Sequence, residues 1–129
     1  MSSVIITNNS YVYEKYKDKM EIIYRDDLNY VQILEFLRDK IHEGHQLLTH
    51  PLSGSIKPNE TPYKTIMISK EKGNLDQQGI LIVEESIATA KKFQSNKPTP
   101  NWTERVLDDF RVIDLSLMEN VIDKLGHKW

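Results

Sequence analysis

The sequence contains no cysteine, which excludes disulfides, thiolate catalysis, iron–sulfur clusters and cysteine-based zinc sites. It also has no excess of one charge, because 17 basic and 19 acidic residues give a net charge of −2. Nucleic-acid and membrane binding need a basic patch that this mixed pattern does not provide. No apolar run approaches the about 18 residues of a membrane span, and no signal-peptide pattern precedes the first apolar run. We therefore expect a cytoplasmic protein with neither nucleic-acid nor membrane partners.

The length and the pattern of apolar residues predict one α/β domain. A chain of 129 residues can bury about two thirds of its unfolded surface in a single core. Short apolar runs predict four strands, at residues 4–7, 20–24, 46–49 and 65–69. Apolar residues at helical spacing predict helices at 11–19, from Asp26 or Asp27 to Gly44, and at about 76–93.

The order of these elements predicts how the strands run. Since the first three strands alternate with helices over short connections, we expect parallel strands and right-handed crossovers. The direction of strand 65–69 stays open, because no helix separates it from the strand before it. The predicted fold class is a three-layer, Rossmann-like α/β fold, with a mostly parallel sheet of about four to five strands flanked by helices.

The C-terminal part is expected to be a helical tail within the same domain, which spans residues 1–129. A polar, proline-containing linker near 94–101 leads into it. Residues 102–109 predict a short helix, and residues 110–113 fit either a helix or a strand. Ser116 then begins a capping-box pattern for a last helix. This tail is predicted to complete the core or to form a dimer surface.

The most unusual segment is the long loop that follows the predicted strand 46–49 and ends at Lys64. It holds three of the five prolines, with His, Ser, Lys, Asn, Glu and Thr side chains between them. Long loops without secondary structure are usually either functional or disordered. Because proline restricts its own backbone and that of the residue before it, we interpret this loop as stiff and suited to carrying binding groups.

Two polar clusters are predicted to meet at one edge of the sheet, because ligands of open α/β sheets bind outside the carboxyl ends of the strands. One cluster follows the first strand and the other follows the third. The helix that begins near the first cluster favours an anion through its free backbone N–H groups. The residues predicted to bind the ligand are Asn8, Asn9, Ser10, Thr49, His50, Ser53, Ser55, Lys57, Asn59 and Thr61.

Within this set, His50 is the candidate acid–base group and Lys57 the group that neutralises a carboxylate or phosphate. Structural alternatives stand beside these roles. Asn8 and Ser10 fit a turn and a helix N-cap, and His50 fits a histidine that anchors its loop. No dinucleotide, phosphate-loop or nucleophile motif is present, and His42 and His45 lack an acidic partner at a recognised spacing. We therefore predict neither a cofactor nor a metal site.

Several stretches resemble the GrdX family. They are I-I-T-N-N at 5–9, V-Y-E-K-Y at 12–16, G-H-Q-L-L-T-H-P-L-S-G-S-I-K-P-N-E-T-P-Y-K at 44–64, and D-F-R-V-I-D-L-S-L at 109–117. The resemblance covers most of the chain. It implies a small protein encoded beside the glycine, sarcosine or betaine reductase system of amino-acid-fermenting anaerobes. It supplies no catalytic residues, and the lack of cysteine excludes a role as a thiol or selenol redox component.

Two hypotheses follow. The first is a non-catalytic accessory protein that binds a small anionic metabolite or a reductase-system protein through residues 49–64. The second is a small cofactor-independent enzyme acting on an anionic metabolite, with His50 as the acid–base group and Lys57 and Asn9 as an anion clamp. We favour the first, because no nucleophile, metal set or cofactor motif supports a defined reaction. A homodimer is compatible with the general frequency of two-fold dimers.

Overall fold

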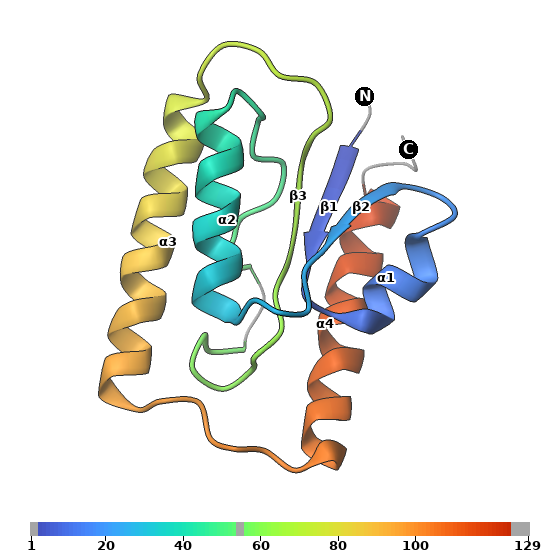
Figure 1. Cartoon of the computed structure of the whole chain (residues 1–129), viewed down its shortest axis with the longest axis vertical. Coiled ribbons are helices and arrows are strands. Elements are labelled where there is room, and N and C mark those ends of the chain that lie inside the picture. The colour runs from blue at the N-terminus through green and yellow to red at the C-terminus, as the bar shows by residue number, and fades with distance from the viewer. Residues whose placement is uncertain (1–2, 54–55, 125–129) are drawn as a thin grey trace.

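The computed structural model describes residues 3–53 and 56–124 (Figure 1). Its strands are β1 (Ser3–Thr7), β2 (Glu21–Tyr24) and β3 (Thr65–Ser69). Its helices are α1 (Ser10–Tyr16), α2 (Tyr30–His42), α3 (Gln77–Asn96) and α4 (Glu104–Lys124). The strand order is β2-β1-β3, with β1 parallel to β2 and antiparallel to β3. The described residues therefore form a small α/β fold around a three-stranded mixed sheet.

The prediction of a mostly parallel, Rossmann-like sheet of four to five strands is wrong. Residues 46–49 make only an isolated antiparallel bridge, between Leu47 and Ile68, instead of a strand. Side chains replace part of the backbone ladder here, because Thr49 Oγ1 accepts from the backbone N–H of Met67 at 3.0 Å. No helix separates residues 46–49 from β3, and the chain turns back through the long loop instead. As a result, β3 is antiparallel to β1.

The sheet is buried on both faces, which explains why its strands are apolar without alternation. Successive side chains of a strand point to opposite faces. Val4, Ile6 and their neighbours on β3 pack against α2 and α3. Ile5 and Met67 pack on the other face against α1 and α4, and Figure 1 shows these two helix pairs on opposite sides of the sheet.

The helix ends differ in detail from the predicted ones. Asn9, and not Ser10, is the N-cap of α1, because Asn9 Oδ1 accepts from the backbone N–H of Tyr11 at 3.0 Å. Asn29 caps α2 in a capping box with Gln32, in place of Asp26 or Asp27. The predicted stop of this helix at Gly44 is confirmed, since Gly44 follows the C-cap with a φ of +112°.

The C-terminal segment is one continuous helix of 21 residues. Residues 110–113, for which the sequence left helix and strand open, are helical, and the predicted start of a separate helix at Ser116 lies inside α4. Met118 and Ile122, four residues apart, are its buried apolar contacts with the sheet. Because α3 continues through Asn96, the segment between these two helices spans residues 97–103.

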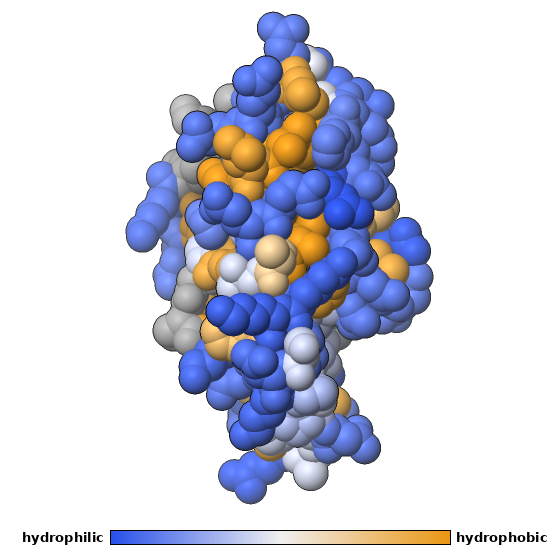
Figure 2. Space-filling view, turned by 90° about the vertical axis from the view of Figure 1, so that its left-hand side faces the viewer, coloured by the Kyte–Doolittle hydropathy of each residue, from blue (hydrophilic) through white to orange (hydrophobic). Residues whose placement is uncertain are grey.

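The outer face of α3 is mostly hydrophilic. Figure 2 shows apolar side chains gathered over the upper part of this face, where the helix begins. Leu81 of the first turns of α3 and Leu75 just before the helix are both exposed. None of the described helices combines the length and the apolar content that crossing a membrane requires.

Candidate functional site

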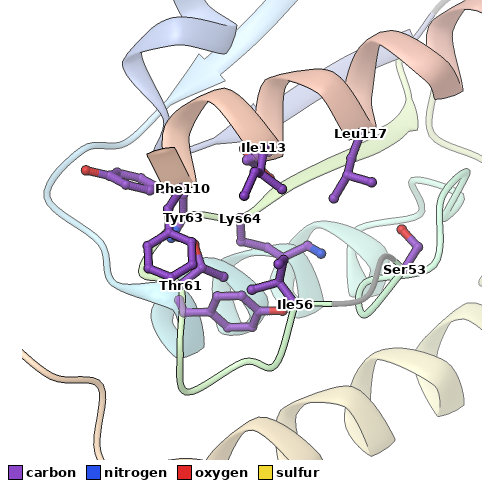
Figure 3. Close-up of a pocket in the computed structure, with 10 residues that line it drawn as sticks. Ser53, Ile56, Thr61, Tyr63, Lys64, Phe110, Ile113 and Leu117 are labelled. Carbon is purple, nitrogen blue, oxygen red and sulfur yellow. The ribbon is translucent and has the colours of Figure 1, made fainter. Parts of the chain in front are cut away.

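A pocket lies at the end of the sheet where β1 ends and β3 begins, with an empty volume of about 300 Å³ (Figure 3). It is lined by α2, the long loop, the residue before β3, and α4, through Tyr30, Ser53, Ile56, Thr61, Tyr63, Lys64, Phe110, Ile113, Asp114 and Leu117. A neighbouring hollow of about 280 Å³ shares Ser53, Lys64, Asp114 and Leu117 with it. We call the two together the Lys64 pocket. Both hollows are small and are continuous with solvent.

Lys64 places a buried ammonium in this pocket. Only 7% of the residue is exposed, and its Nζ lies 5.7 Å from the centre of the Tyr30 ring. Within the described part of the chain, this ammonium makes no ion pair and no hydrogen bond. Burial lowers the pKa of Lys64, and the charge of Asp114 opposes that effect. A buried charge without a direct partner is costly, so it marks a candidate binding site.

Asn8 fixes the position from which Lys64 enters the pocket. Its Oδ1 accepts from the backbone N–H of Lys64 at 2.8 Å. Its Nδ2 donates to the backbone carbonyls of Leu28 and Pro62 at 3.0 and 2.9 Å. Asn8 therefore ties the end of β1 to the segments before α2 and before β3, and it has little capacity left for a ligand.

Asp114 supplies the opposite charge from α4. Its Oδ2 accepts from Thr65 Oγ1 at 2.6 Å and from Asn9 Nδ2 at 3.0 Å. Its Oδ1 accepts no hydrogen bond from the residues that the structure describes. Burial raises the pKa of Asp114, whereas these two donors and the charge of Lys64 lower it. One oxygen is thus anchored and the other is free to accept from a ligand.

A chain of hydroxyl groups stands behind this carboxylate. The backbone N–H of Asn9 donates to Thr7 Oγ1 at 3.0 Å, and Thr7 Oγ1 lies 2.7 Å from Thr65 Oγ1. Since Thr65 donates to Asp114, Thr7 must donate to Thr65. Hydrogen bonds that point the same way along a chain strengthen one another, so the network stabilises the ionised carboxylate.

Apolar side chains form part of the pocket walls. Figure 3 shows Ile113 and Leu117 of α4 on one side of the Lys64 side chain and Ile56 of the loop on the other. Ile113 and Leu117 are 38% and 36% exposed, so the apolar wall reaches the surface. Removing water from the neighbourhood of a charge strengthens its interaction with a bound partner of opposite charge.

Arg111 holds one wall in place. Its guanidinium lies 5.3 Å from the ring centre of Tyr11 and 5.5 Å from that of Tyr63. It donates from Nη1 to the Tyr63 hydroxyl at 2.6 Å and forms ion pairs with Glu104 and Asp108. These contacts fix the Tyr63 ring against the pocket while Arg111 itself lies behind it.

Of the predicted ligand-binding residues, Thr49, Ser53 and Thr61 line the Lys64 pocket. Asn8 and Asn9 lie behind it, and their side chains serve the network already described. Ser10 is the first residue of α1. Ser55 lies outside the described residues.

The remaining predicted residues lie elsewhere. Lys57 and Asn59 line a separate hollow of about 420 Å³, together with Glu60, Lys97, Pro100 and Trp102. Asn59 donates from Nδ2 to the backbone carbonyl of Lys97 at 2.8 Å. His50 is exposed, and its Nδ1 accepts from the backbone N–H of Leu52 at 3.1 Å. That contact matches the alternative of a histidine that anchors its own loop.

No group of three or more His, Asp or Glu side chains suited to hold a metal occurs in residues 3–53 and 56–124. His45 is buried, and its Nδ1 lies 2.7 Å from the backbone carbonyl of Ser69, so it is held by β3. His42 is exposed on the last turn of α2.

Lys64 and Asp114 are absent from the predicted site, although each leaves a signal in the sequence. Lys64 directly precedes the apolar run of β3, a position where the backbone enters the core. Asp114 follows Phe110 by four residues and precedes Met118 by four, which puts an acid on the inward stripe of an amphipathic helix. A charged residue next to or within a run of core residues is the signal that the two share.

Comparison with known proteins agrees with the resemblance in the sequence. The family model described as GrdX-like protein matches residues 4–123. No curated protein and no solved structure matches the chain.

Proposed function

Since the chain belongs to the GrdX-like protein family, we propose that it is a non-catalytic accessory protein of the glycine reductase system that binds a small anionic metabolite. The Lys64 pocket is the binding site in this proposal. Of residues 49–64, through which the sequence predicts binding, Thr49, Ser53, Thr61 and Lys64 line this pocket. The protein acts in the cytoplasm, and its macromolecular partner is a protein of the reductase system or a second copy of itself.

The observation that carries the anion-binding part is the ammonium of Lys64. It is buried in an open pocket and has no ion pair among the described residues. A carboxylate or phosphate oxygen supplies the acceptor that this ammonium lacks. Thr61 adds a donor, because its Oγ1 accepts from the backbone N–H of Tyr63 and keeps its own hydrogen for a ligand.

The enzyme hypothesis stays a prediction without a supporting observation. His50 does not line the Lys64 pocket, and its ring contact is within its own loop. General acid–base catalysis requires the group to lie within hydrogen-bond reach of the substrate. We therefore base the proposed function on binding.

The experiment is a titration of the purified protein with acetate and with inorganic phosphate, followed by the amide NMR signals of residues 64–66 and 113–117. Lys64→Met removes the pocket ammonium, and Lys57→Met is the matched control, because Lys57 is exposed and lines the other hollow. We expect binding in the unmodified protein and in Lys57→Met, and its loss in Lys64→Met. A ligand at about 100 times its Kd also adds about 2.7 kcal/mol of stability, which a thermal melt detects.

Two results contradict the proposal. If neither anion binds, the pocket is not an anion site. If binding survives Lys64→Met and disappears in Lys57→Met, the ligand binds on the loop as the sequence predicts. The accessory role is tested separately, by whether the tagged protein retains reductase components from a host that expresses them.

A further inference from the structure

We propose that the Lys64 pocket selects a small zwitterionic amino carboxylate, whose carboxylate pairs with the Lys64 ammonium and whose ammonium pairs with the Asp114 carboxylate. This inference rests on the proposed function, because it keeps the Lys64 ammonium as the partner of the ligand's carboxylate and adds a second charged group to the ligand. It is carried by two opposite charges that share one cavity without pairing directly with each other.

The first part of the argument is the position of the two charges. Lys64 and Asp114 both line the main pocket and the neighbouring hollow. They interact at a distance, since the charge of each shifts the pKa of the other. Among the described residues, however, neither forms an ion pair. Direct contact of the two side chains would satisfy both charges, whereas without it each charge keeps capacity for a ligand group.

The second part is the number of unused donors and acceptors. The Lys64 ammonium has three N–H donors, and the described residues accept none of them. Asp114 keeps Oδ1 as an acceptor, because Thr65 and Asn9 both donate to Oδ2. A complementary ligand therefore presents an acceptor at one end and a donor at the other.

Simple ions satisfy only half of this arrangement. An anion bound at Lys64 lies near the Asp114 carboxylate and is repelled by it. A cation bound at Asp114 is repelled by Lys64 for the same reason. A zwitterion brings an attractive partner to each charge, so it gains from both and avoids both repulsions.

The remaining walls limit which side chain the ligand can carry. Ile56, Ile113 and Leu117 surround the charges with apolar surface. They leave no further charged group in the pocket to recognise a charged side chain of the ligand. The class is therefore an amino carboxylate with no side chain or with a short aliphatic one.

The test compares three probes that differ by one charged group each: glycine, acetate and methylamine. Titration calorimetry and the amide signals of residues 64–66 give Kd for each probe, which for molecules of this size falls in the micromolar-to-millimolar range. We expect glycine to bind at least about tenfold more tightly than either half, because each added charge-assisted hydrogen bond is worth about 1.5–3 kcal/mol, or roughly 10–150-fold.

Asp114→Asn makes the expected pattern specific. The variant should weaken glycine binding by at least about tenfold, since it removes the partner of the ligand ammonium. The same variant should leave acetate binding unchanged or make it tighter, because the carboxylate that repels acetate is gone. Asp109→Asn is the matched control, since Asp109 is an exposed acid of the same helix and does not line the pocket.

Each outcome decides between the two proposals. If acetate and glycine bind equally and Asp114→Asn changes neither, the zwitterion inference is wrong and the anion site stands. If neither probe binds, both proposals fail. Should Asp114→Asn not fold, the comparison of the three probes on the unmodified chain still decides the inference.

Discussion

Removing both charges of the Lys64 pocket should make the protein more stable while it abolishes binding. The perturbation is the double variant Lys64→Met with Asp114→Asn. Methionine keeps an unbranched side chain of similar length in the apolar part of the pocket. Asparagine keeps an oxygen that accepts from Thr65 and Asn9, as Asp114 does at 2.6 and 3.0 Å.

The size of the effect follows from burial. Lys64 is 7% exposed, and burial shifts the pKa of both groups towards the neutral form. Replacing a buried charge pair by neutral groups of similar volume is often stabilising, by about 1–4 kcal/mol. For a domain of this length, each kcal/mol raises Tm by about 4 °C. The double variant should therefore gain about 4–16 °C.

The assay is urea unfolding at pH 7, with the two single variants included to complete a double-mutant cycle. Each single variant should gain less than the double variant, because each leaves one buried charge without the other. Lys57→Met should be neutral within about 0.5 kcal/mol, as expected for an exposed side chain. A double variant that is less stable than the unmodified protein by about 1 kcal/mol or more would refute the reasoning, since the two charges would then stabilise the fold.

Two further predictions concern the polar network. Asn9→Ala should lower the free energy of unfolding by at least about 2 kcal/mol in a urea titration, because it removes the N-cap of α1 and the hydrogen bonds to Arg111 and Asp114; a loss below about 0.5 kcal/mol would contradict this role. The stability difference between Asp114→Asn and the unmodified protein should depend on pH. Since burial raises the folded-state pKa of Asp114 above its ordinary value of 3.8, the unmodified protein loses stability relative to the variant as the pH rises from 3.8 through the raised value. Measured from pH 3 to pH 8, the stability advantage of Asp114→Asn should be small in acid and reach a larger, constant value near neutral pH. An advantage that shrinks as the pH rises would contradict the prediction.

The local pattern of apolar and polar residues is sufficient to predict most of the secondary structure. Strands 4–7, 20–24 and 65–69 correspond to β1, β2 and β3, because each is an apolar run bounded by polar residues. The segment 46–49 has the same appearance and is not a strand, since Ser69 and Thr49 side chains take over backbone hydrogen bonds along β3. Whether side chains replace backbone hydrogen bonds in this way depends on which residues face each other across the sheet, and a local sequence pattern does not show that.

The location of the candidate site depends even more on long-range contacts. The sequence brings the end of β1 and the long loop to one edge of the sheet, and the structure places Asn9 and Thr49 near that edge. The charges there come from Lys64 and Asp114, whose roles require the antiparallel entry of β3 and the course of α4. The sequence marks each as a charge beside apolar residues but does not bring the two together, because nothing between residues 97 and 103 indicates which face of the sheet α4 will cover.

The contacts of Asn9 also determine when the pocket can form during synthesis. Its Nδ2 reaches Arg111 and Asp114, which are 102 and 105 residues further along the chain. Until α4 has left the ribosome, the carboxylate side of the pocket does not exist, and Ile5 and Met67 lack the cover that Met118 and Ile122 provide. A nascent chain therefore exposes an apolar sheet face to chaperones through most of its synthesis. The Lys64 pocket and the burial of that face are completed together, by the same helix.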